Sequence, residues 1–81
     1  MSQTEEKPAL RALRLIAAGD QDGAHVLVQD DPSSEAAWVH AHLHRVEGDL
    51  ANAGYWYRRA GKPAVTVSLD QEWTAITEAL L

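Results

Sequence analysis

Apolar residues recur along this chain at the three- and four-residue spacing of a helix face, in stretches separated by glycine, aspartate and proline. The first stretch covers residues 9–18 and has apolar residues at Ala9, Leu10, Ala12, Leu13, Ile16 and Ala17. Four more follow: between Asp20 and Asp30, from Ser33 or Ser34 to about Glu47, from Asp49 to about Ala60, and from Ser68 to Leu81. The pattern predicts an all-α protein of about five short helices.

The residues between these stretches are typical of helix boundaries. Asp20 and Asp49 are placed to cap the helices that follow them, and Ser68 with Gln71 matches the capping-box pattern. Glycines that can end a helix stand at Gly19, Gly48 and Gly61. Residues 62–67 are therefore expected to be a loop before the last helix.

The Gly-Asp boundary occurs twice, 29 residues apart (48 − 19), which suggests an internal repeat of helix, turn and helix. The segment Gly48-Asp49-Leu50 with Ala53, Tyr57 and Ala60 resembles the second half of a tetratricopeptide repeat. Gly19-Asp20 with Ala24 is a fainter copy. The resemblance covers about residues 9–61 and implies two antiparallel helical hairpins. The spacing is shorter than the family's period of roughly 34 residues.

The last helix carries Trp73, Ile76 and Leu80 on one face. A helical array needs its exposed end covered, so we expect this helix to cap the two hairpins. Trp73 then lies in the core or in a dimer contact. The segment from Trp38 to Gly61 also resembles small bacterial proteins of unknown function, and that likeness implies no activity.

Composition and charge narrow the classes of function. The 81 residues suffice for one domain, expected over residues 9–81 after a flexible lead-in at 1–8. The absence of cysteine excludes disulfides and thiolate-ligated zinc. A net charge of −5 disfavours nucleic acid and anionic membranes as partners. No apolar run approaches the roughly 18 residues of a membrane span, so a cytoplasmic location is expected.

A group of histidines is the first candidate for chemistry. His40 and His44 are one helical turn apart, and Glu47 follows three residues later on the same flank. Two imidazoles and a carboxylate can ligate a divalent metal, with His25 as a further ligand from elsewhere. The alternative is a hairpin boundary where these side chains form structural hydrogen bonds. We expect His42 to point to the opposite, outward side.

The second candidate is a surface of aromatic and arginine residues. If the third and fourth helices pack antiparallel, their outward side chains share one patch. Tyr and Arg are frequent anchors in protein interfaces, and Arg also suits a phosphate or carboxylate ligand. The expected partner-binding residues are Trp38, His42, Arg45, Tyr55, Arg58 and Arg59.

These observations favour a binding protein over an enzyme. The chain has neither a Gly-x-Ser-x-Gly elbow nor a Gly-rich phosphate loop, so we expect no catalytic activity and no cofactor. The first hypothesis is a small module that binds a protein or peptide, including a second copy of itself. The alternative is a metal- or anion-binding protein that uses His40, His44 and Glu47.

Overall fold

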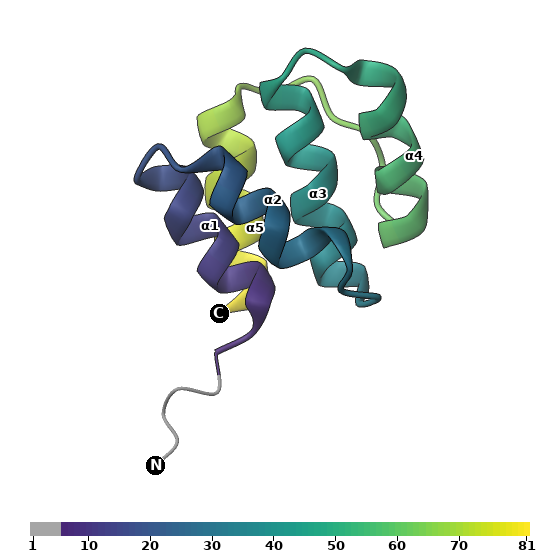
Figure 1. Ribbon diagram of the computed structural model, residues 1–81. Helices are drawn as coiled ribbons and strands as arrows, with labels where there is room; N and C mark the ends of the chain where they lie inside the picture. The colour runs from purple at the N-terminus through teal and green to yellow at the C-terminus, as the bar shows by residue number, and fades with distance from the viewer. Residues whose placement is uncertain (1–5) are drawn as a thin grey trace.

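The computed structural model describes residues 6–81, which form five α-helices joined by short connections (Figure 1). The helices are α1 (Pro8–Ala17), α2 (Gln21–Gln29), α3 (Ser34–Val46), α4 (Leu50–Ala60) and α5 (Leu69–Leu80). The predicted all-α class is confirmed. Residues 1–5 of the expected lead-in lie outside the described residues, and helix α1 already begins at Pro8.

The helix boundaries follow from local chemistry. Gly19 and Gly48 have φ angles of 87° and 78°, which an L-residue with a side chain rarely adopts. The aspartate after each glycine caps the next helix: Asp20 accepts a hydrogen bond from the Gly23 amide at 2.9 Å, and Asp49 accepts one from Asn52. Because these signals are local, the sequence placed the boundaries to within one or two residues.

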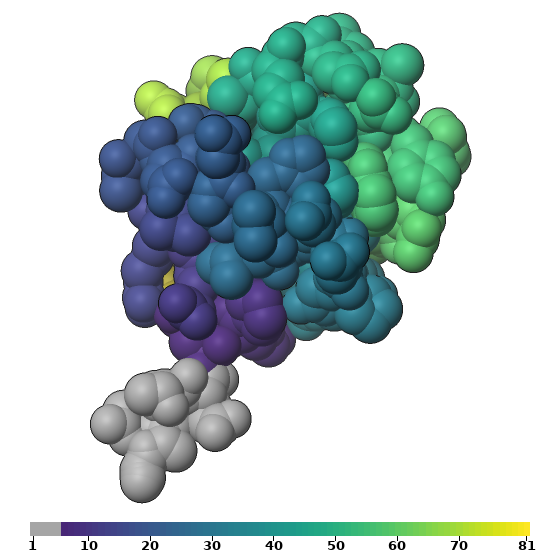
Figure 2. All heavy atoms as spheres, viewed as in Figure 1, coloured from purple at the N-terminus to yellow at the C-terminus, as the bar shows by residue number. Residues whose placement is uncertain are grey.

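Helix α3 is the central element, since it packs against each of the other four helices that the structure describes. Helix α1 packs with α2, and α4 packs with α3, so the chain forms two helical hairpins in sequence. The space-filling view shows α2, in blue, lying directly against the second hairpin (Figure 2). In residues 6–81 no helix is long and apolar enough to cross a bilayer.

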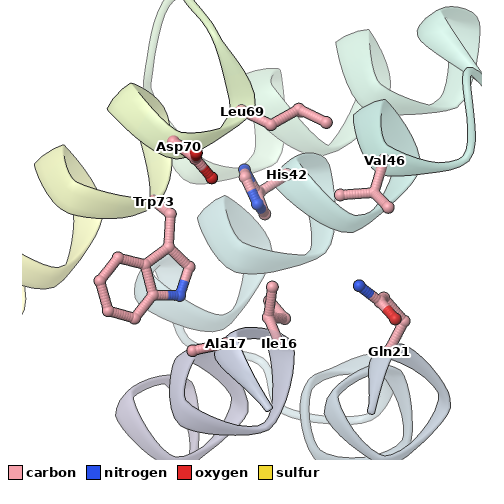
Figure 3. A pocket seen from close by; sticks show the side chains of 8 residues that line it. All are labelled: Ile16, Ala17, Gln21, His42, Val46, Leu69, Asp70 and Trp73. Atoms are coloured by element: carbon pink, nitrogen blue, oxygen red, sulfur yellow. The ribbon is translucent and has the colours of Figure 1, made fainter. Parts of the chain in front are cut away.

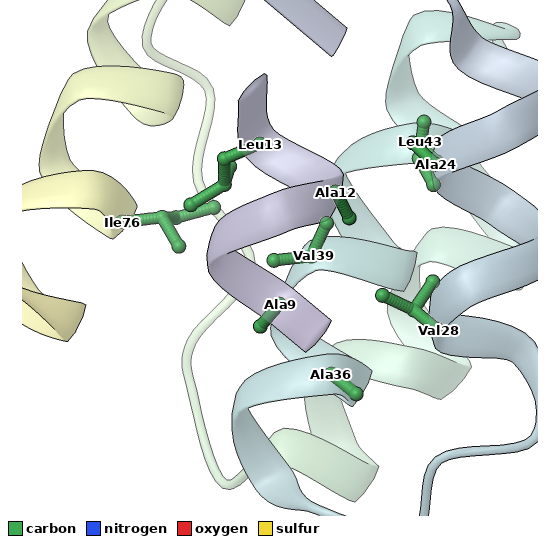
Figure 4. Packing of buried hydrophobic residues seen from close by; sticks show 9 residues of the cluster. All are labelled: Ala9, Ala12, Leu13, Ala24, Val28, Ala36, Val39, Leu43 and Ile76. Carbon is green, nitrogen blue, oxygen red and sulfur yellow. The ribbon is translucent and has the colours of Figure 1, made fainter. Parts of the chain in front are cut away.

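The main core fills the space between α1, α2, α3 and α5 (Figure 4). Small residues let the helices approach closely, and the larger side chains fill the remaining gaps. Its buried members are Ala9, Ala12, Leu13, Ala24, Val28, Ala36, Val39, Leu43 and Ile76. A smaller cluster of Ala41, Ala53 and Tyr57 joins α3 to α4, and Trp38 packs against both clusters.

In contrast to the expected cap, helix α5 does not cover the end of the second hairpin. It packs against α1 and α3, with Ile76 fully buried and the Trp73 indole N–H donating to the Leu13 carbonyl at 2.8 Å. Its connection to α4 is a side-chain hydrogen bond from Tyr57 to Glu72. The last helix therefore spans both hairpins on the side formed by α1 and α3.

Candidate functional site

Three histidines from the two hairpins meet at the contact between α2 and α3. His40 and His44 project from successive turns of α3, and His25 reaches them from α2. Each offers one ring nitrogen, and these nitrogens all lie within 4.8 Å of one another. We call this group the histidine cluster. The structure thus brings His25 to the pair that the sequence singled out, whereas Glu47 lies outside the group.

The rings in the cluster are in direct contact. The Nε2 atoms of His25 and His40 are 2.8 Å apart, which is a hydrogen bond in which one ring donates and the other accepts. His40 and His44 are stacked, with centroids 5.0 Å apart and 14° between their planes. The contact needs an uncharged acceptor nitrogen, and an uncharged imidazole nitrogen is the form that binds metal ions.

Burial keeps His40 uncharged. Its side chain is 4% exposed, and burial, with the neighbouring His25 and His44, lowers the pKa of His40 from 6.5 to about 4. The Nδ1 atoms of His40 and His44 are buried without hydrogen-bond partners in the described part of the chain. Buried polar atoms of this kind are uncommon and are typical of sites that hold a water or an ion.

Two carboxylates stand behind His44. Its Nδ1 lies 3.6 Å from Glu47 Oε1 and 3.7 Å from Asp49 Oδ2. A nearby carboxylate favours the tautomer with the proton on Nδ1, which leaves Nε2 free to act as a ligand. Glu47 thus lies beside His44 and outside the group of three nitrogens, and its role as a direct metal ligand stays a prediction.

Helix α4 adds an aromatic wall to the cluster. The indole of Trp56 stacks on His40, with centroids 3.9 Å apart. On the exposed side, the Arg59 guanidinium lies 5.2 Å from the Trp56 ring centroid and donates to the Tyr55 hydroxyl at 3.0 Å. Arg59 and Tyr55 therefore lie around Trp56, beside the cluster.

A second polar group, which the sequence pattern did not reveal, is centred on Glu72 of α5. His42 Nδ1 and an Arg45 guanidinium nitrogen each lie 2.8 Å from Glu72 Oε1, and the Tyr57 hydroxyl donates to Oε2. Burial raises the pKa of Glu72, but the hydrogen bonds from His42, Tyr57 and Arg45 outweigh it and leave the pKa below its ordinary value. Glu72 is thus a buried carboxylate with three donors.

The expected partner-binding patch is not one continuous surface. The prediction that His42 points outward is wrong: it is 1% exposed and faces Glu72, because α5 covers that side of α3. Arg45 is also turned toward Glu72 and donates to the Val67 carbonyl at 2.6 Å. Exposed side chains remain on α4, at Tyr55, Arg58 and Arg59. Trp38 is half-buried beneath Lys62, whose Nζ lies 4.4 Å from its ring centroid.

One signal for Glu72 was present in the sequence. It lies one turn before Ile76, on the buried face of an amphipathic helix, where a carboxylate needs buried donors.

No protein-family model, curated protein or solved structure matches the chain. The relation to tetratricopeptide hairpins therefore stays a prediction.

Proposed function

We propose that this protein binds a divalent transition-metal ion through His25, His40 and His44. The observation that carries the proposal is the convergence of three ring nitrogens, from two packed helices, within 4.8 Å of one another. Two further features support it: the buried Nδ1 atom of His40 has no hydrogen-bond partner within residues 6–81, and two carboxylates lie 3.6 and 3.7 Å from Nδ1 of His44. Together they form an imidazole site with outer-sphere support.

The spacing suits an ion of the size of zinc. Ligand nitrogens in a tetrahedral site with Zn–N bonds of about 2.0–2.1 Å are about 3.3 Å apart. To bind zinc, the Nε2 atoms of His25 and His40, which are 2.8 Å apart, must separate slightly. The nitrogens that lie farther apart, at up to 4.8 Å, must approach one another. Half-exposed His25 can make this adjustment by rotating its side chain. A water or a carboxylate completes the fourth position.

Imidazole ligands restrict the choice of metal. Zn²⁺, Cu²⁺, Ni²⁺ and Co²⁺ accept neutral imidazole, whereas Mg²⁺ and Ca²⁺ require oxygen ligands. Copper(I) and iron–sulfur clusters are best held by thiolates, and the chain has no cysteine. We therefore assign the site to the imidazole-binding divalent ions.

Calorimetric titration with Zn²⁺, after EDTA treatment, tests the proposal. We expect one ion per chain, with His25→Gln weakening binding at least about 100-fold, above the range for loss of an outer-shell partner. His25 is suitable because it is half-exposed, so its replacement should leave the fold intact. Gln29→Ala, an exposed change on the same helix, is the matched control. Stoichiometric binding that survives His25→Gln would contradict the site, as would no saturable binding.

A second candidate, binding of a protein, a peptide or another copy of this chain, is favoured by the outer side of α4. Among the described helices α4 packs only against α3, and it exposes Tyr55 on its outer side and Leu50 at its first position. Static light scattering over a range of concentrations tests the self-association form. A dimer that Leu50→Gln converts to monomer would support it, and a constant monomer mass would exclude it.

A further inference from the structure

A cavity of about 380 Å³ lies where α1, α2 and α3 meet the beginning of α5, and no residue of α4 lines it (Figure 3). Its volume falls in the range of about 300–1,000 Å³ that is usual for small-ligand sites. Its lining residues are Ile16, Ala17, Gln21, His42, Val46, Leu69, Asp70 and Trp73. We call it the His42 cavity. Most of its wall is apolar, and three polar side chains face it.

His42 provides a fixed hydrogen-bond acceptor in this cavity. Its ring is almost completely buried and lies amid the lining side chains in Figure 3. Because Glu72 is an acceptor, His42 must donate from Nδ1, which places the proton there. In the neutral ring Nε2 is then an acceptor, and it has no hydrogen-bond partner within residues 6–81. The contact with Glu72 thus orients the imidazole so that Nε2 can accept a hydrogen bond from a ligand.

The charge of the cavity selects the ligand. Asp70 contributes a carboxylate that forms no ion pair within the described residues, and no Lys or Arg lines the cavity. Arg45, a half-buried cation that shares Glu72 with His42, is already paired with that carboxylate. The indole of Trp73 uses its N–H to bond Leu13, and its aromatic ring remains beside the cavity. An aromatic ring near a carboxylate favours a cation.

We propose that the His42 cavity binds a small organic ammonium ion with an apolar body. The ammonium group donates to His42 Nε2 and pairs with the Asp70 carboxylate. The apolar body lies against Ile16, Val46 and the ring of Trp73. This site is separate from the histidine cluster, because His25, His40 and His44 do not line the cavity.

The test compares three probes of one shape and different charge: benzylammonium, benzyl alcohol and benzoate. Each is titrated into ¹⁵N-labelled protein in EDTA, with the Trp73 indole N–H and the His42 ring nitrogens followed by NMR. We expect saturable shifts at both residues with benzylammonium, binding at least tenfold weaker for benzyl alcohol, and no saturable shift with benzoate. Equal binding of benzoate, or no saturable response to benzylammonium, would overturn the proposal.

Two variants locate the binding without disturbing His42. Asp70→Asn should reduce the affinity for benzylammonium to that for benzyl alcohol, whereas Asp22→Asn should leave it unchanged. Asp22 is a matched control, because it is also an exposed aspartate in the first turn of a helix but lies outside the cavity. Ala17→Leu, which adds volume at an exposed lining position, should weaken all binding. An affinity that neither Asp70→Asn nor Ala17→Leu changes would place the probe elsewhere and refute the assignment.

Discussion

The imidazole of His40 lies nearly parallel to the indole of Trp56, with ring centroids 3.9 Å apart and 19° between the ring planes. The two residues come from α3 and α4, so this contact extends the histidine cluster to the second helix of the second hairpin. It also places a fluorescent side chain against one of the proposed metal ligands. Any ion held by His40 would therefore lie close to Trp56.

Copper(II) should quench the fluorescence of Trp56. A paramagnetic ion bound at His40 lies within a few ångströms of the stacked indole, whereas Trp73 packs near Leu13 on another side of α3. Titration with Cu²⁺ at micromolar protein should give a saturable loss of emission in the wild type. Trp56→Phe should abolish most of that loss while calorimetry still detects binding, and Trp73→Phe should retain it. Quenching that disappears in Trp73→Phe instead would contradict the site.

Acid should destabilise the metal-free protein through His40. Its pKa is about 4 when folded, against 6.5 for the ordinary side chain. Between these values the unfolded chain binds a proton that the folded chain does not, so the free energy of unfolding decreases as pH falls. At about 1.4 kcal/mol per pKa unit, His40 accounts for a loss of about 2 kcal/mol between pH 6.5 and pH 5. Urea denaturation at pH 7 and pH 5 in EDTA measures it.

His40→Gln is the control for this pH dependence, because glutamine retains hydrogen-bonding groups and does not titrate. The variant should show a smaller difference in stability between pH 7 and pH 5 than the wild type. Glu72 does not account for this difference, because its pKa is lowered in the fold. Its contribution to the free energy of unfolding is lost only at pH values below the ordinary 4.5. Equal differences for the two proteins would show that His40 is not the residue responsible.

Tyr57→Phe should destabilise the fold by about 1–3 kcal/mol, because it removes one of the three donors to a buried carboxylate. Without that donor, the pKa of Glu72 should rise. Tyr55→Phe is a matched control, since the Tyr55 hydroxyl is exposed and accepts a hydrogen bond from exposed Arg59. That change should cost less than about 0.5 kcal/mol. Urea denaturation measures both variants. Equal losses of unfolding free energy for Tyr57→Phe and Tyr55→Phe would contradict the role of Glu72.

Ile76→Ala should cost about 2–5 kcal/mol, since it opens a cavity in the main core at a fully buried position of α5. Leu81→Ala, a change at an 86% exposed residue just after the same helix, should be nearly neutral. Chemical denaturation followed by circular dichroism provides both values. A small cost for Ile76→Ala would mean that α5 contributes little to the stability of the fold.

The helices could be predicted from the sequence because their boundaries are encoded by adjacent residues. Gly19 with Asp20, and Gly48 with Asp49, specify an end and a cap without reference to the rest of the chain. The Ser68–Gln71 capping box is likewise local, and it is present in the structure. The packing positions of α2 and α5 depend on contacts distant in sequence, which the helical pattern does not contain.

The direction of His42 shows this limit. Projection onto a helical wheel assumes one buried face, and His42 lies on the flank of the Val39–Leu43 stripe that is opposite to His40 and His44. Helix α3 is surrounded by α1, α2, α4 and α5, so that this flank is buried as well. In the same way, His40 and His44 were recognised as neighbours from their spacing. The membership of His25 depends on how α2 lies against α3, which the sequence left open.

The three donors around Glu72 determine how α5 is aligned along the molecule. An apolar stripe alone would still meet apolar neighbours if the helix slid by one turn, about 5.4 Å. The same slide would carry the carboxylate away from His42, Arg45 and Tyr57 together, leaving a buried charge without partners. Glu72 thus fixes the register of the last helix, because every displaced register would bury its carboxylate without hydrogen-bond donors.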